Sequence, residues 1–184
     1  MSNPTSNRFS TLRTTLLSLG FIVGIPGIAH AQSQAASGTP VPFSLDTTQY
    51  HAFVSNWNGP SNQIHCAVIQ TPAQWNANFS SAPVMSAQPQ KFSPPDSFYQ
   101  AQQLFLLSKI TPGVPQNQQL LHVSAVTAKD DTISVSYTYT APSSPNAYTQ
   151  SDNLLIVTNK ADVHAHRIDF IENGQLACTA QIAQ

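Results

Sequence analysis

LLHVSAVT (residues 120–127), KDD (129–131) and TISVSYTYT (132–140) are the stretch that decides the fold class of this chain. In the last run, four apolar or aromatic residues alternate with serine and threonine: Ile133, Val135, Tyr137 and Tyr139. A period of two is typical of a strand with one buried and one solvated face. The polar turn joins the two runs as a hairpin. We therefore expect a β-rich fold in which the two tyrosines pack with the core.

A second hairpin is predicted near the end of the chain. Asn173-Gly174 separates two strand-like runs, residues 163–172 and 175–182. An Asn-Gly pair is typical of the two-residue turn that needs a positive φ at both central positions. In the second run, alternation predicts that four residues share the inward face: Leu176, Cys178, Ala180 and Ile182.

Two more strands are expected upstream. LFLLSKI (104–110) has the length and composition of a buried strand, and the residues just before it could form a helical turn. The run from Gln63 to Gln70 alternates and places Ile64, Cys66 and Val68 on one face.

One short helix is predicted near residues 72–79. Thr71-Pro72-Ala73-Gln74 combines a capping residue, a proline suited to the first helical position, and a capping-box glutamine. Trp75 and Phe79 follow four residues apart and anchor the helix on the core, although they could also form a ligand-stacking surface. The fold class is therefore α+β: mostly antiparallel β, as a sheet sandwich or partial barrel, with one short helix.

Residues 1–31 predict a secretory signal peptide. Arg8 and Arg13 precede a short apolar run, and Ala29-His30-Ala31 supplies the small residues of a cleavage site before Gln32. The run is too short to remain as a membrane span. We expect an exported protein, periplasmic or secreted, with a flexible tail at 32–40 and a single domain at 41–184.

The charge composition argues against one class of partner, nucleic acids. Without the signal peptide, five basic residues face eight acidic ones, which gives a net charge of −3. No basic patch is present, so nucleic-acid binding is not expected. Cys66 and Cys178 are the only cysteines, and an even count in an exported chain favours a disulfide between them.

Motifs for catalysis are largely missing, and His164-Ala165-His166 is the best chemical candidate. Residues two apart on a strand project to one face, so both imidazoles could hold a metal ion. A third ligand would be required, and four residues are candidates: His51, His65, His122 and Asp169. The simpler interpretation is two exposed polar residues, with Val163 and Ala165 facing inward. We expect no tight metal site and no cofactor.

Trp57 is the one candidate contact residue. It lies beside Asn56, Asn58 and Gly59 in an expected turn. An indole in a polar turn could mark a carbohydrate or protein contact, or it could be partly buried.

Several segments between residues 65 and 172 follow a characteristic order: VIQTPAQW (68–75), LFLLSKI (104–110), residues 120–140, PSSP (142–145), LLIVTNK (154–160) and RIDF (167–170). This order resembles the C-terminal domain of the PrcB-like family of bacterial protease-complex proteins. Thr111-Pro112-Gly113-Val114 stands where that family has a glycine-rich hairpin start. The resemblance implies a noncatalytic exported module that associates with a protease, and it transfers no catalytic residue.

The sequence thus favours a noncatalytic binding or interaction module. Its partner would be an exported protease or another envelope protein. The alternative is a small exported enzyme, metal-dependent or carbohydrate-active, that uses His164 and His166.

Overall fold

The computed structural model of this chain describes residues 38–48, 50, 52–55, 64–81, 91–115 and 118–183. The expected signal peptide, His51 and Trp57 lie outside the described residues, as does most of the expected tail. The elements in chain order are β1 (Thr39–Pro40), β2 (Ser44–Leu45), β3 (Ala52–Val54), β4 (Ile64–Ile69), α1 (Pro72–Asn78), β5 (Phe79–Ser81), α2 (Phe98–Ala101), β6 (Gln102–Pro112), β7 (Leu121–Lys129), β8 (Thr132–Tyr139), β9 (Thr149–Asn159), η1 (Lys160–Asp162), β10 (Arg167–Glu172) and β11 (Gln175–Gln181).

Five strands form the first sheet, in the order β1-β7-β8-β10-β11. The predicted β7–β8 hairpin is confirmed, and so is the β10–β11 hairpin, whose Asn173 and Gly174 have φ values of 49° and 85°. Strand β10 lies between β8 and β11 and runs parallel to β8. The C-terminal hairpin therefore adds to the five-stranded sheet beside β8.

Four strands form the second sheet, in the order β2-β9-β6-β4, and all their pairings are antiparallel. Strand β6 is central and long, and residues 103–109 are buried without interruption. Burial on both faces explains why this strand reads as a continuous apolar run instead of an alternating one.

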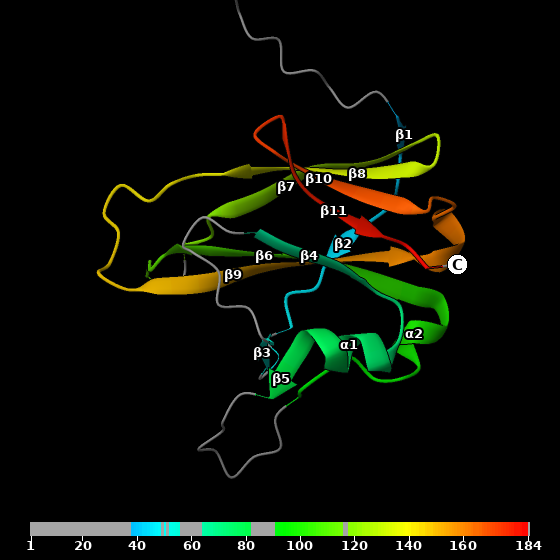
Figure 1. Ribbon diagram of the computed structural model, residues 1–184, viewed down its shortest axis with the longest axis horizontal. Helices are drawn as coiled ribbons and strands as arrows, with labels where there is room; N and C mark the ends of the chain where they lie inside the picture. The colour runs from blue at the N-terminus through cyan, green and yellow to red at the C-terminus, as the bar shows by residue number, and fades with distance from the viewer. Residues whose placement is uncertain are drawn as a thin grey trace, which may run out of the picture. The chain divides into compact units, whose positions relative to one another are not determined.

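The four-stranded sheet is the middle layer of the fold (Figure 1). One face packs against the five-stranded sheet, through Phe105 and Leu107 of β6 and residues such as Ile133 and Phe170. Its other face packs through Leu104 and Leu106 against the helices and the small β3–β5 sheet. Successive residues of β6 thus enter two different cores. The predicted sandwich with a helix is confirmed, and the strands in the described ranges close no barrel.

Helix α1 begins as its sequence predicts. The main-chain N–H of Gln74 donates to Thr71 Oγ1 at 3.1 Å, and Pro72 occupies the first helical position. The capping box is incomplete, because Gln74 Oε1 accepts from the main-chain N–H of Gln70 instead of from that of the cap residue Thr71. Trp75 is fully buried and stacks on Phe79 with ring centroids 4.2 Å apart, so the interpretation of these rings as a core anchor is confirmed.

The two larger sheets are joined along both sides. On one side the chain passes from β1 in the five-stranded sheet to β2 in the four-stranded sheet through buried Val41. On the other side lie the edge strands β4 and β11, and the disulfide Cys66–Cys178 links them with a Cα–Cα distance of 6.3 Å. The expected disulfide is present.

Several boundaries and faces differ from the expectation. The C-terminal hairpin begins at Arg167, because residues 163–166 follow η1 as an irregular segment. A bulge at the Phe170/Ile171 step leaves Ala177 without a register partner on β10 and reverses the alternation, so Leu176 is 63% exposed.

Two further findings concern the ends of elements. Pairing with β7 already starts at Thr39, within the range expected to be a flexible tail. The possible helical turn before β6 is present as α2, so the described residues hold two α-helices where the expected fold class had one. None of the helices in the described ranges has the length and apolarity that a membrane crossing requires.

Candidate functional site

A pocket of about 580 Å³ lies at the end of the four-stranded sheet where β6 begins. This volume falls in the range of small-molecule sites. Five segments contribute to its wall: the end of β4 with the start of α1, the first residues of β6, η1, the irregular segment 163–165, and the residues after β11. The lining residues are Gln70, Thr71, Gln74, Gln103, Lys160, Val163, His164, Ala165, Ile182 and Ala183.

Three glutamines form a connected row in this pocket. The main-chain N–H of Gln70 donates to Gln74 Oε1 at 2.6 Å, and the side-chain Nε2 of Gln70 donates to Gln103 Oε1 at 2.9 Å. Gln103 is 1% exposed, and its Nε2 lies 3.5 Å from Thr158 Oγ1. These hydrogen bonds fix the positions of the oxygen and nitrogen atoms of the side-chain amide groups, so the polar wall of the pocket is preorganised.

Lys160 supplies the only formal charge among the described lining residues at neutral pH. Its Nζ donates to two main-chain carbonyls, Gln70 O at 3.1 Å and Tyr99 O at 2.7 Å. An ammonium group has three donors, so one remains without a partner in the described part of the chain. Within the same ranges, no carboxylate lines the pocket. The half-buried ammonium is therefore held in place but not neutralised.

His164 lies on the rim of this pocket, while His166 has a different environment. The His164 side chain is exposed and makes no hydrogen bond or ion pair within the described residues. His166 Nδ1 lies 2.5 Å from Asp131 Oδ1 on the β7–β8 turn. Bonding to His166 holds the pKa of the Asp131 carboxyl below its ordinary value. Both histidines are exposed and Ala165 is buried, as the simpler interpretation expected.

The candidate third metal ligands have other contacts or lie elsewhere. His65 Nε2 is 3.1 Å from Asn78 Oδ1, and Asp169 accepts from Arg167 and Thr179. His122 is exposed on β7. Across the ranges that the structure describes, no three His, Cys, Asp or Glu side chains gather as a metal site would require.

The opposite end of β6, six residues or about 20 Å from Gln103, holds a buried ion pair between the sheets. Lys109 Nζ lies 2.5 Å and 2.7 Å from the two oxygens of Glu172, and the side chains are only 10% and 19% exposed. Lys109 belongs to the four-stranded sheet and Glu172 to the five-stranded sheet. The pair therefore links the two layers through the core.

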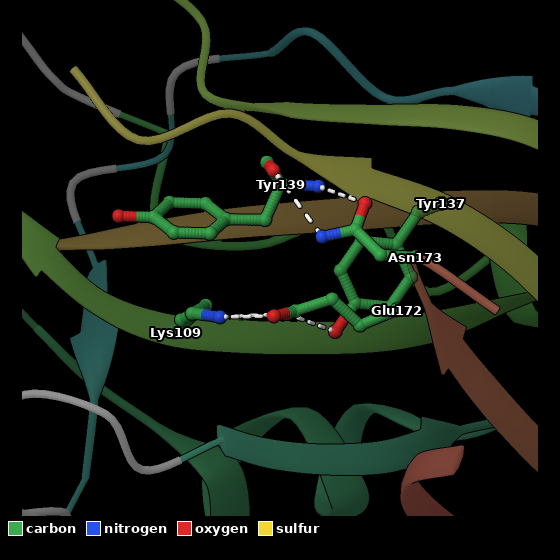
Figure 2. A network of polar contacts seen from close by, with 5 residues as sticks. All are labelled: Lys109, Tyr137, Tyr139, Glu172 and Asn173. Atoms are coloured by element: carbon green, nitrogen blue, oxygen red, sulfur yellow. Dashed lines mark hydrogen bonds and ion pairs between the residues drawn. The ribbon is translucent and has the colours of Figure 1, made fainter. Parts of the chain in front are cut away.

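Two tyrosines of β8 complete this cluster. Figure 2 shows Tyr137 and Lys109 reaching the same carboxylate, with the Tyr137 hydroxyl donating to Glu172 Oε2 at 2.8 Å. Burial, followed by the bond to Glu172, raises the pKa of Tyr137. Lys109 Nζ also lies 4.1 Å from the centre of the Tyr139 ring, and Asn173 bonds to the Tyr139 main chain. The cluster is closed and mutually satisfied, which is typical of a structural network.

Sequence reasoning missed both polar sites. A signal for the ion pair was present in the sequence. On β6, Lys109 points to the same face as Phe105 and Leu107. On β10, Glu172 points to the same face as Ile168 and Phe170. Opposite charges at inward-facing positions of two strands predict an ion pair. Among the residues that line the pocket, the sequence offered only His164 as a functional candidate, and it assigned Thr71 and Gln74 to the helix cap.

A second, smaller pocket of about 420 Å³ lies beside the helix layer, where Asp46, Tyr50, Trp75 and Phe79 contribute to its wall. The Tyr50 hydroxyl donates to Asp46 Oδ2 at 2.8 Å, and burial together with this bond raises the pKa of Tyr50 to about 12. Because Trp75 is 0% exposed, its ring offers no open stacking surface.

No protein-family model, no curated protein and no solved structure matches this chain, so the PrcB-like resemblance stays a prediction.

Proposed function

We propose that this chain is a noncatalytic exported binding module and that its ligand occupies the pocket at the start of β6. The observation that carries the proposal is the polar part of that wall: three glutamines, a threonine, a lysine and a histidine lie beside four apolar residues in a pocket of about 580 Å³. Fixed amide donors and acceptors in a concave site are suited to a small hydrophilic molecule, such as a sugar or an amino acid.

Export is supported by two independent features. The signal-peptide pattern of residues 1–31 predicts it, and the Cys66–Cys178 disulfide is compatible with an oxidising compartment. On the pattern-level resemblance, the module would associate with an exported protease or another envelope protein. In this proposal the pocket senses or presents a small molecule, and chemistry belongs to the partner.

The ligand proposal is tested on purified, disulfide-intact protein with a panel of neutral sugars and amino acids. Amide chemical shifts of the isotope-labelled protein report binding. We expect at least one compound to give saturable shifts at residues 70–74, 103 and 160–165, and Gln70→Ala to weaken them. Gln181→Ala is the matched control, because Gln181 is an exposed glutamine of β11 outside the pocket lining. Turnover of a bound compound, or shifts confined to other surfaces, would contradict the proposal.

Export has its own test. The N-terminus of protein recovered from outside the cytoplasm should begin at Gln32. An intact Met1 terminus in a membrane fraction would exclude a cleaved signal peptide.

A further inference from the structure

We infer that the pocket at the start of β6 contains an anion subsite, in which Lys160 Nζ and the His164 imidazole bind a carboxylate of the ligand. The inference rests on the proposed function and narrows its ligand class to small carboxylates that also carry hydroxyl or amide groups. Neutral sugars and neutral amides would then be weaker ligands than acids of the same shape.

Lys160 differs from the other lysines of the described ranges in combining partial burial with the lack of a carboxylate partner. Lys91 and Lys129 are exposed, and the buried Lys109 is paired with Glu172. Lys160 instead faces two carbonyl oxygens. Carbonyl dipoles satisfy donors but carry no net charge, so a half-buried ammonium with such partners keeps its attraction for an anion.

Preorganisation strengthens the subsite. Gln70 O follows the end of β4 and Tyr99 O belongs to α2, so two separate parts of the fold hold the ammonium in place. A lysine that is already immobilised loses little side-chain entropy when it binds a ligand. The third N–H of the Lys160 ammonium can therefore donate to a ligand at a small cost in side-chain entropy.

The surrounding charges favour a monoanion. Among the described lining residues contributed by the end of β4, α1, β6 and the residues after β11, none is charged at neutral pH. The nearest carboxylate along η1, Asp162, is exposed and accepts from Asn159 Nδ2 at 3.0 Å. A single positive charge matches a carboxylate better than a doubly charged phosphate.

His164 adds a second donor to the subsite. Its exposed imidazole lines the same pocket as Lys160 and makes no hydrogen bond or ion pair within the described residues. A ring N–H can therefore donate to the carboxylate that the ammonium binds.

The probe is sodium acetate, compared with its neutral isostere acetamide at constant ionic strength, and binding is followed by amide shifts of the full exported chain. For so small a ligand we expect a dissociation constant on the order of 10 mM for acetate. Acetamide should bind at least about tenfold more weakly, because an ionised acceptor roughly doubles the strength of each hydrogen bond. Equal shifts with both compounds would overturn the inference.

Variants assign the subsite. Lys160→Met should abolish the acetate response, whereas Lys129→Met, at the exposed last residue of β7, should leave it unchanged. Because Lys160 also binds two carbonyls, His164→Ala provides a second variant at an exposed side chain. It should weaken acetate binding without abolishing it. An acetate response that either substitution leaves unchanged would refute the assignment.

Three outcomes separate this inference from the proposed function. If neutral compounds bind the pocket and acetate does not, the anion subsite is wrong and the binding function stands. If inorganic phosphate binds more tightly than acetate, the carboxylate assignment is wrong. If no compound shifts the pocket residues, both proposals fail.

Discussion

Replacing Lys109 by methionine tests whether the ion pair between the sheets stabilises the fold. Methionine fills most of the lysine's volume and removes only the charge and the donors. The Glu172 carboxylate, 19% exposed, then keeps one hydrogen bond, from the Tyr137 hydroxyl. An uncompensated charge in such a place is the main cost of the substitution.

The magnitude follows from the surroundings of each group. Breaking a buried pair by removing one partner costs about 3–5 kcal/mol, and we take about 3 kcal/mol here because Glu172 retains some exposure. Glu172→Gln should cost less, about 2 kcal/mol, since Lys109 keeps its contact with the Tyr139 ring and Tyr137 keeps an acceptor. The double variant carries no buried charge, and it should lose only about 1 kcal/mol.

The assay is urea unfolding at neutral pH with the disulfide intact, for the wild type, both single variants and the double variant. In a parallel thermal unfolding experiment, a loss of about 3 kcal/mol should lower the melting temperature of a domain of this size by roughly 6–12 °C. Lys129→Met, at an exposed lysine, serves as the control and should change stability by less than about 0.5 kcal/mol. If the double variant proves less stable than Lys109→Met, the pairing argument is refuted and packing of the alkyl chain explains the loss.

Three further predictions concern other parts of the fold. Replacing Cys66 and Cys178 by alanine should lower the free energy of unfolding by about 4–5 kcal/mol in urea, because the bridge spans a sequence separation of 112 residues; a loss below about 1 kcal/mol would contradict this. Trp75→Ala should cost about 3–5 kcal/mol by the same measurement, since the ring is fully buried, and wild-type stability would contradict its role as the anchor of α1. The depressed pKa of Asp131 means that its pair with His166 adds stability above the ordinary aspartate pKa, and that this contribution is lost as the pH falls through the folded-state pKa. In His166→Ala the carboxyl titration of Asp131, followed by carbon NMR, should move up toward the ordinary value, and an unchanged midpoint would show that the bond does not cause the shift.

The sequence predicted those parts of the fold that depend on neighbouring residues. The period of two in β8, the Asn173-Gly174 turn and the cap of α1 are local, and each is confirmed because backbone geometry there is decided within a few residues. Strand β6 was also identifiable, since burial on both faces leaves a continuous apolar run.

Features that depend on distant partners were not predictable in this way. The parallel insertion of β10 beside β8 and the bulge that exposes Leu176 arise from pairing across the sheet. The pocket is assembled from five segments, several of them distant from one another in the sequence. The position of the Lys160 ammonium is fixed by hydrogen bonds to main-chain carbonyls, and every residue has a main-chain carbonyl, so the sequence does not indicate this contact. Of the His164 and His166 pair, only the first reaches the pocket, because the segment that carries them is irregular and not a strand.

The disulfide between the two edge strands also determines how the protein would respond to proteolysis. Cys66 and Cys178 enclose the exposed, Pro- and Ser-rich connection at residues 140–148. Such connections are preferred sites for proteases. A single cut there leaves two fragments that remain covalently joined, with β6 and β9 still hydrogen-bonded on either side of the cut. Nicked molecules would therefore migrate as one species until a reductant separates them, and the pocket at the start of β6 would keep all its walls.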